Sequence, residues 1–239
     1  SMISTCEKGG QFAKALELFD EARANNRDPG IAAYSATIAA CGKSGDWQRA
    51  LKLLDDLRER GLEPTVVTYG AAISACKRGN QCDTALALFE ELRHRGLQPN
   101  IITYNTLIST LGNAGRWQKA LELFTELRDL SSTQRDEDHD DDDNRTAAIN
   151  HVEPNVVTYT ATISAVEKGG QLRKAFELFD DMRQRGLEPN LITYSTAISA
   201  CERGGQWREA LHLLDELQRR GLVPNVITYS AAISACEKG

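Results

Sequence analysis

A period of 35 residues is the feature that most constrains what this sequence can fold into. Copies of one pattern open on a short stretch ending in tyrosine, most often Val-Thr-Tyr or Ile-Thr-Tyr, and most close on Pro-Asn. Except at one interruption, the tyrosine recurs at intervals of 35 residues, at Tyr34, Tyr69, Tyr104, Tyr159, Tyr194 and Tyr229. A period of about 20 to 50 residues is typical of proteins built from stacked units, in which each unit packs only against its neighbours.

Each copy of the pattern predicts two helices. In the copy 66–100, the first helix is expected roughly over 68–78 and the second roughly over 81–95. Gly79-Asn80 separates them and Gly96 ends the second, because glycine tolerates the left-handed backbone that such turns need. We therefore expect an all-α fold, a right-handed α-α superhelix of helix-turn-helix units whose inner lining is formed by the first helices.

The copies divide the chain into a single array, which we expect to be a fragment of a longer one. We number the positions of each repeat from 1 to 35. The array comprises a partial repeat 1–30, the repeats 31–65, 66–100, 101–155, 156–190 and 191–225, and a partial repeat 226–239.

The repeat 101–155 is long because an acidic insertion interrupts it at about 131–150. We expect its second helix to end near Asp129 or Leu130. The insertion contributes a net charge of −5, seven acidic residues against two arginines, to the −6 of the whole chain. Such a composition cannot bury enough apolar area to fold, so a solvated, disordered loop is predicted. A divalent-cation site around His139 is the alternative, although the glycine and ligand spacing of a calcium loop are missing.

The cysteines occupy positions that are apolar in the other copies. Cys82 stands at position 17, where other copies carry Phe, Trp or Leu, and five more stand at position 11: Cys6, Cys41, Cys76, Cys201 and Cys236. Free cysteine behaves as a small buried hydrophobe. No CxxC or Cys/His spacing of a metal site occurs. We expect buried thiols, no metal, no cofactor and a reducing intracellular compartment.

Two rows of residues on the first helices are not explained by packing. Position 5 varies among small polar types and glycine: Ser35, Gly70, Asn105, Thr160, Ser195 and Ser230. Position 13 is basic in every copy except one, which carries Asn113; the cations are Lys8, Lys43, Arg78, Lys168, Arg203 and Lys238. Cations suit phosphates and short polar groups suit base edges, so the two rows favour a single strand of nucleic acid. A basic residue near a helix C-terminus also interacts with the helix dipole, and that interpretation stays open.

At this point the sequence resembles a known family. The motif VVTYGAAISACKRGN…ALALFEELRHRGLQPN, with its period of 35, is similar to pentatricopeptide repeat proteins of the P-class, whose repeats all have 35 residues. The resemblance covers the whole chain except the acidic insertion. It implies selective binding of single-stranded RNA, one base per repeat, in a mitochondrion or plastid, for RNA processing, stabilisation or translation.

The resemblance also implies a role for each position. Positions 5 and 35 select the base: Ser35 with Thr65, Gly70 with Asn100, Asn105 with Asn155, Thr160 with Asn190, and Ser195 with Asn225, and Ser230 begins a further pair. Position 2 clamps the base, with Val67, Ile102, Val157, Ile192 and Ile227, and weakly with Ala32. The cations of position 13 meet phosphates.

The combinations imply a target of 5′-N-(A)-C/U-A-A-3′. The pairs beginning with Thr160 and Ser195 resemble adenine readers, and the pair beginning with Asn105 resembles a pyrimidine reader that prefers cytosine. Gly70 offers no side chain and gives a weak adenine preference, and the base that Ser35 and Thr65 read stays open.

A protein-interaction scaffold is the alternative function. The position 5 residues are small and uncharged, and outside the insertion the net charge is about −1, so the groove could also hold a peptide. An enzyme is not expected, since no nucleophile and base arrangement or phosphate-binding glycine loop occurs. We expect a monomer without a membrane span.

Overall fold

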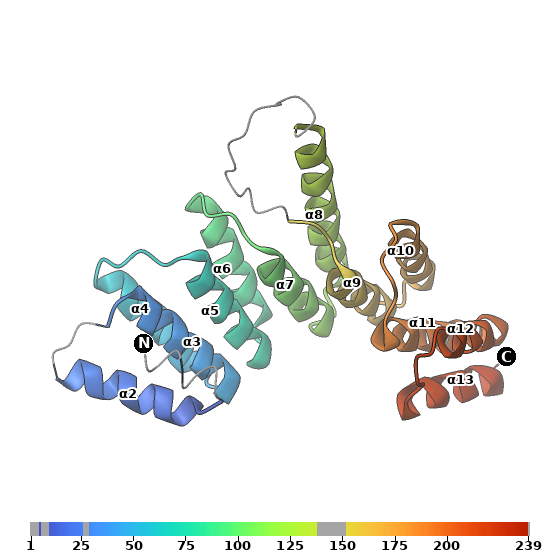
Figure 1. Cartoon of the computed structure of the whole chain (residues 1–239), viewed down its shortest axis with the longest axis horizontal. Coiled ribbons are helices and arrows are strands. Elements are labelled where there is room, and N and C mark those ends of the chain that lie inside the picture. The colour runs from blue at the N-terminus through green and yellow to red at the C-terminus, as the bar shows by residue number, and fades with distance from the viewer. Residues whose placement is uncertain (1–4, 6–9, 26–28, 138–151, 239) are drawn as a thin grey trace. The chain divides into compact units, whose positions relative to one another are not determined.

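The computed structural model describes all residues except 1–4, 6–9, 26–28, 138–151 and 239. The regular elements of the described residues are all helices (Figure 1), so the prediction of an all-α fold is confirmed. They are α2 (Phe12–Ala24), α3 (Ile31–Ser44), α4 (Trp47–Glu59), α5 (Val66–Arg78), α6 (Cys82–His94), α7 (Ile101–Asn113), α8 (Trp117–Glu137), α9 (Val156–Lys168), α10 (Leu172–Gln184), α11 (Leu191–Gly204), α12 (Trp207–Arg219) and α13 (Val226–Lys238).

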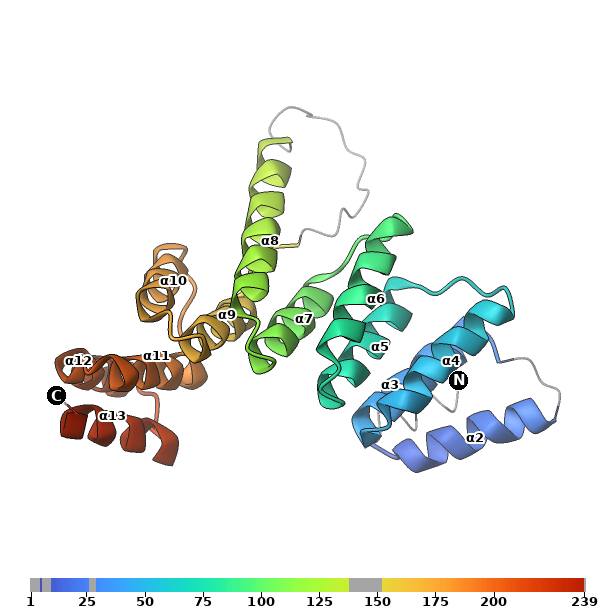
Figure 2. The same cartoon turned by 180° about the vertical axis from the view of Figure 1, so that it is seen from behind.

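The chain forms two compact units, Ser1–Thr110 and Leu111–Gly239. In the first unit, α3 packs against α4 and against α5, and α5 packs against α6. In the second unit, α9 packs against α10 and α11, and α11 packs against α12 and α13 (Figures 1 and 2). Each unit is thus a stack of helical hairpins in which successive first helices are neighbours. None of the helices in the described part of the chain is long and apolar enough to cross a membrane.

Side-chain caps and left-handed glycines set the helix boundaries. The Asn190 side chain accepts a hydrogen bond from the Thr193 amide at the start of α11, and Asn155 caps α9 in the same way. Such caps satisfy amide groups that have no partner within the helix. At the ends of the second helices, Gly61 and Gly186 have positive φ angles of 71° and 74°. The turns therefore form where the sequence predicts them.

The position 4 tyrosines from Tyr34 to Tyr194 form the centre of the core, whereas Tyr229 on α13 is exposed. Tyr194 is fully buried, and its ring packs edge to face on Phe179 of the preceding hairpin, with centroids 5.5 Å apart. Its hydroxyl donates to Glu216 at 3.0 Å, and burial together with this carboxylate raises the pKa of Tyr194 to about 12. Glu216 also pairs with Arg183 of the preceding hairpin at 3.1 Å. One carboxylate therefore ties the tyrosine of its own hairpin to an arginine of the hairpin before it.

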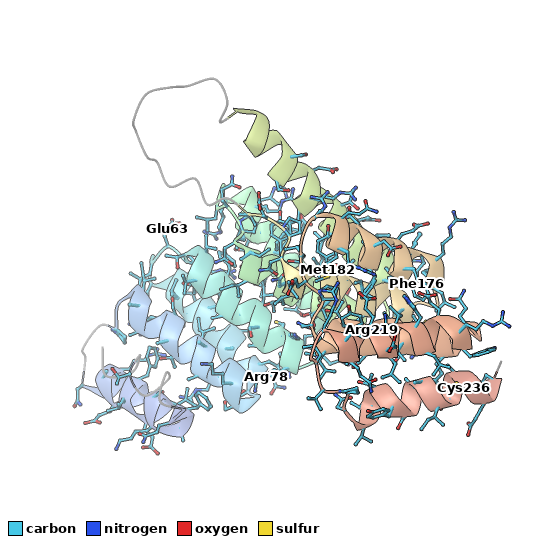
Figure 3. All side chains as sticks on the ribbon, turned by 45° about the vertical axis from the view of Figure 1, so that its right-hand side comes forward. Glu63, Arg78, Phe176, Met182, Arg219 and Cys236 are labelled. Atoms are coloured by element: carbon cyan, nitrogen blue, oxygen red, sulfur yellow. The ribbon has the colours of Figure 1, made fainter. Side chains whose placement is uncertain are left out.

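The predicted burial of the cysteines is confirmed for four of them: Cys41, Cys76, Cys82 and Cys201. Burial raises the pKa of Cys76 to about 11 and that of Cys201 to about 12, because the charged thiolate is disfavoured away from water. The prediction is wrong for Cys236, which is exposed on α13 (Figure 3) because no further hairpin covers that face in this structure. Cys6 lies outside the described residues.

The expected end of the second helix in the repeat 101–155 is also wrong. Helix α8 continues past Asp129 and Leu130 to Glu137. The reason is visible at position 31, where Ser131 replaces the glycine of Gly61, Gly96, Gly186 and Gly221. Without a residue that readily takes a left-handed turn, the helix runs on into the start of the acidic insertion. The rest of the insertion, including His139, lies outside the described residues.

Candidate nucleic-acid interface

The residues at position 2 are exposed apolar side chains on the first helices of both compact units. Between 57% and 69% of each residue's surface is exposed in Val67, Ile102, Val157, Ile192 and Ile227. Each stands in the first turn of its helix, one residue before a fully or almost fully buried threonine. Isolated exposed apolar residues are common, but here exposure recurs at the same position of each of these repeats.

The residue at position 35 is the N-cap of the next first helix. Asn190 Oδ1 accepts from the amide of Thr193 at 3.0 Å and from its hydroxyl at 3.1 Å. Asn225 Oδ1 accepts from the amide and hydroxyl of Thr228, both at 2.9 Å. Because the backbone N–H can only donate, the oxygen of each amide must face the helix. The amide nitrogen is then the group left for a ligand.

The residue at position 5 lies at the seam between its own first helix and the next one. Thr160 Oγ1 is 2.7 Å from Thr193 Oγ1, and Ser195 Oγ is 2.7 Å from Thr228 Oγ1. Ser195 is only 9% exposed and Ser35 only 8%, whereas Gly70, Asn105 and Thr160 are half-buried and Ser230 is exposed. The sequence predicts hydrogen-bonding groups that are open to a ligand at position 5. Ser35 and Ser195 are more buried than this prediction implies.

The predicted pairs of positions 5 and 35 meet through the threonine that stands at position 3 of the following repeat. In the first unit, Ser35 Oγ is 2.8 Å from Thr68 Oγ1, which is 3.1 Å from Thr65 Oγ1. Asn100 Oδ1 accepts from the Thr103 hydroxyl at 2.9 Å, while Gly70 adds no side chain to this arrangement.

One predicted pair is divided between the two compact units. Asn105 belongs to the first unit and Asn155 to the second, so their pairing stays a prediction from the sequence.

The cations at position 13 are exposed at the C-terminal ends of the first helices, as Arg78 is on α5 (Figure 3). Arg78 donates to the backbone carbonyl of Lys43 at 2.8 Å. Lys43 itself lies over the Phe12 ring, 5.6 Å from its centroid. Lys8 lies outside the described residues.

In the second unit the cations at position 13 have polar or acidic partners. Arg203 pairs with the buried Glu167 at 3.0 Å, and Lys238 pairs with Glu202 at 2.9 Å. Lys168 donates to the Asn113 side chain at 2.8 Å. Burial raises the pKa of Glu167. These glutamates stand at position 12, which the sequence analysis did not single out.

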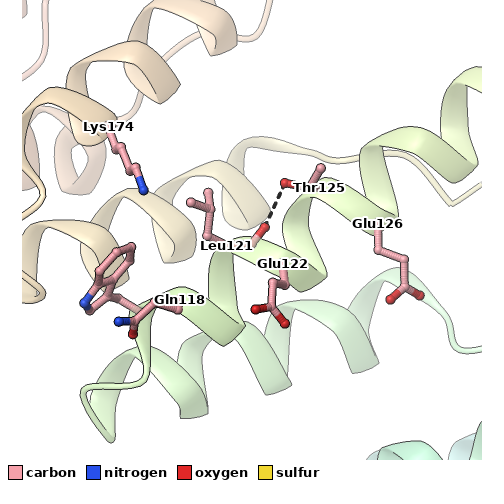
Figure 4. Close-up of a pocket in the computed structure, with 7 residues that line it drawn as sticks. Gln118, Leu121, Glu122, Thr125, Glu126 and Lys174 are labelled. Atoms are coloured by element: carbon pink, nitrogen blue, oxygen red, sulfur yellow. Dashed lines mark hydrogen bonds between the residues drawn. The ribbon is translucent and has the colours of Figure 1, made fainter.

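A groove lies between α8 and α10 (Figure 4). The Lys174 ammonium stands 4.8 Å from the centroid of the Trp117 ring, and the Thr125 hydroxyl donates to the Leu121 carbonyl at 2.9 Å. The groove contains none of the predicted site residues. Across the part of the chain that the structure describes, no group of three His, Cys, Asp or Glu side chains could hold a metal ion.

Sequence profiles of pentatricopeptide repeats match most of the chain. The profile of the pentatricopeptide repeat domain matches residues 17–81, 52–114 and 87–129, and the PPR repeat family profile matches 154–203 and 196–238. A third PPR repeat profile matches residues 1–26. A comparison with curated protein sequences gave no match.

Solved structures of such proteins have the same fold. The crystal structure of the pentatricopeptide repeat protein PPR10 from maize is 32% identical and matches with a TM-score of 0.67, covering 99% of this chain and 31% of its own. PPR10 in complex with an 18-nt psaJ RNA element is 29% identical with a TM-score of 0.50, covering 97% of this chain and 34% of its own. The chain thus spans about a third of the length of PPR10.

A more distant structure agrees on the fold alone. The PPR domain of Arabidopsis thaliana protein-only RNase P 1, solved in complex with tRNA, is 16% identical with a TM-score of 0.61, covering 80% of this chain and 91% of its own. The α-α superhelix class expected from the sequence is therefore confirmed. With repeat profiles matching along most of its length, the chain belongs to the pentatricopeptide repeat family.

Proposed function

We propose that this protein binds single-stranded RNA along its first helices and reads one base per repeat. The observation that carries the proposal is the pairing of positions 5 and 35 through a shared threonine, beside an exposed apolar residue at position 2. At Thr160, Asn190 and the neighbouring Val157, this arrangement offers a hydroxyl, an amide nitrogen and an apolar contact surface within one hairpin step.

Each group suits one part of a nucleotide. Apolar side chains can contact the faces of unstacked bases, and short polar groups can bond their edges. Positions 5 and 13 of a helix are about 12 Å apart along its axis, at 1.5 Å per residue. A long Lys or Arg side chain at position 13 can therefore reach toward the phosphate of a nucleotide whose base lies near position 5.

The related PPR10 structures support this proposal, because PPR10 was solved in complex with an RNA element and its sequence is about 30% identical to this chain. By the same relation we propose a role in the processing, stabilisation or translation of RNA in a mitochondrion or plastid. The protein would act as an adaptor that recognises the RNA and performs no catalysis itself.

Exchanging one base-selecting residue tests the proposal. Thr160→Asn is expected to move the preference at the fourth base of 5′-N-(A)-C/U-A-A-3′ from adenine toward a pyrimidine, leaving the other bases unchanged. The measurement is the dissociation constant for four RNAs that differ only at this base, each at two salt concentrations. Phosphate contacts require the affinity to fall with added salt.

Thr196→Asn is the matched control, because Thr196 stands at position 6 of the next repeat and its hydroxyl bonds only the Ile192 carbonyl of its own helix, at 2.8 Å. This variant should keep the wild-type preference at every base. An unchanged preference in Thr160→Asn would refute the assignment of positions 5 and 35. Salt-independent binding without base preference would favour the peptide-binding scaffold.

A further inference from the structure

The threonine at position 3 is buried between two residues that the proposed function assigns to base selection. Thr193 and Thr228 are fully buried in the second unit, and Thr68 is fully buried in the first. The hydroxyl of Thr228 lies 2.7 Å from Ser195 Oγ and 2.9 Å from Asn225 Oδ1. The equivalent distances at Thr193 are 2.7 Å to Thr160 Oγ1 and 3.1 Å to Asn190 Oδ1.

The hydroxyl protons of this arrangement can be counted. Ser195 and Thr228 have one hydroxyl proton each, and the oxygens within reach belong to each other, to Asn225 Oδ1 and to the Leu191 carbonyl at 2.8 Å. A contact of 2.7 Å between two hydroxyl oxygens requires one of the two protons between them. In one arrangement Ser195 donates to Thr228, which donates to Asn225; in the other Thr228 donates to Ser195, which donates to Leu191.

Both arrangements use both protons inside the protein. Without breaking one of these internal hydrogen bonds, the hydroxyl at position 5 can meet a ligand only as an acceptor. The amide at position 35, whose oxygen faces the threonine, can then meet it only as a donor. An acceptor hydroxyl favours the exocyclic amino group of adenine or cytosine over the carbonyl oxygen of guanine or uracil, because a carbonyl would place lone pairs against lone pairs.

We propose that the position 3 threonine is a specificity-determining positioning residue, which fixes the place and the hydrogen-bonding role of the two base-selecting side chains that it joins. The inference rests on the proposed function and extends it to a residue that no base touches. It applies to Thr193 for the repeat 156–190 and to Thr228 for the repeat 191–225.

The test selects bound RNAs from a random pool with the wild type and with Thr193→Val, Thr228→Val and Thr193→Ser. Thr193→Val should reduce the preference for adenine at the fourth base about tenfold, which corresponds to one hydrogen bond of about 1.4 kcal/mol. Thr228→Val should reduce the preference for adenine at the fifth base, the adjacent one on the 3′ side. Thr193→Ser, which keeps the hydroxyl, should restore the wild-type profile.

Thr162→Val is the matched control, because Thr162 is also fully buried but its hydroxyl bonds only the Thr158 carbonyl of its own helix, at 2.9 Å. A merely structural role of Thr193 predicts an equal loss of affinity for all RNAs, in both Thr193→Val and this control. That result would overturn the inference while leaving RNA binding intact. A wild type that binds RNA with no base preference would overturn the inference together with the proposed function.

The repeat 66–100 permits the opposite experiment, which does not depend on whether the valine variants fold. There Asn100 and Thr103 are already joined, and a Cβ on Gly70 would lie at an ordinary 3.4 Å from Thr103 Oγ1. Gly70→Ser should complete the arrangement seen at Ser35 and raise the adenine preference at this base about tenfold. Gly70→Ala, which adds only the Cβ, should leave the preference unchanged; equal profiles for the two variants would count against the inference.

Discussion

Glu167 pairs with Arg203, one of the cations at position 13 in the second unit. It is 4% exposed, and its carboxylate lies 3.0 Å from Nε of Arg203, which also donates to the Glu167 backbone carbonyl. An RNA phosphate would have to compete with this carboxylate for the guanidinium. Burial raises the pKa of Glu167, so the carboxylate is also less stable in its charged form than an exposed one.

Glu167→Gln should therefore strengthen RNA binding and make it more sensitive to salt. Releasing Arg203 for one further phosphate contact is expected to steepen the slope of log K against log[salt] by about 0.7. The measurement is an RNA titration over a series of salt concentrations.

The control for this change is Glu177→Gln, which alters the net charge equally at an exposed residue of α10, paired only with Arg173 of the same helix. Equal slopes for the two variants would mean that Arg203 contacts no phosphate.

At the scale of the helical hairpin, close packing is set by an aromatic residue at position 17 and a glycine at position 14 of the next repeat. A Cβ on Gly169 would lie 2.2 Å from Cδ1 of the Trp117 ring, and a Cβ on Gly79 would meet Trp47 at the same distance. Both glycines have negative φ angles of about −80°, so space and not backbone conformation requires them.

Gly169→Ala is expected to lower the free energy of unfolding by about 1–3 kcal/mol, the usual cost of overpacking. Adding Trp117→Leu should recover part of the loss, because Leu172 faces Gly204 at the equivalent place with only its flexible Cδ1 methyl, 2.7 Å from the Cβ position. Denaturant unfolding of both single variants and the double variant measures the coupling. Strictly additive losses would show that the two residues are not in contact.

The helices and turns of most repeats could be predicted from the sequence because a left-handed glycine and a buried tyrosine mark them locally. The extension of α8 was missed, although Ser131 at a glycine position was visible, because the acidic composition that follows indicated disorder. The threonine between positions 5 and 35 was also missed. Its partners lie 33 residues before it and 3 residues before it, and helical periodicity does not predict contacts between hairpins.

Helical periodicity is also insufficient to predict the burial of the site residues. It can indicate that position 2 is on an exposed helical face, whereas the burial of Ser35 and Ser195 depends on how closely successive first helices approach. The ion pair of Arg203 with Glu167 also joins two hairpins. Two sequence signals could have indicated these contacts. The recurrence of Thr at position 3 indicates the contact with position 5, and Glu at position 12 in the second unit indicates the ion pair with Arg203.

Across the whole molecule, the two compact units differ in the base-selecting pairs that the sequence assigns to them. In the first unit, Ser35 is paired with Thr65, and Gly70 offers no side chain. The second unit holds both complete pairs of an acceptor hydroxyl with an asparagine amide, those that begin with Thr160 and Ser195. We therefore expect the second unit to contribute most of the base selection.

Selection of bound RNAs from a random pool by the wild-type protein tests the central claim most directly. The account predicts enrichment of single-stranded RNAs with two adjacent adenines, preceded by cytosine or uracil, and an affinity that falls with added salt. Binding without any enriched sequence, or enrichment of a sequence without the adenine pair, would contradict it.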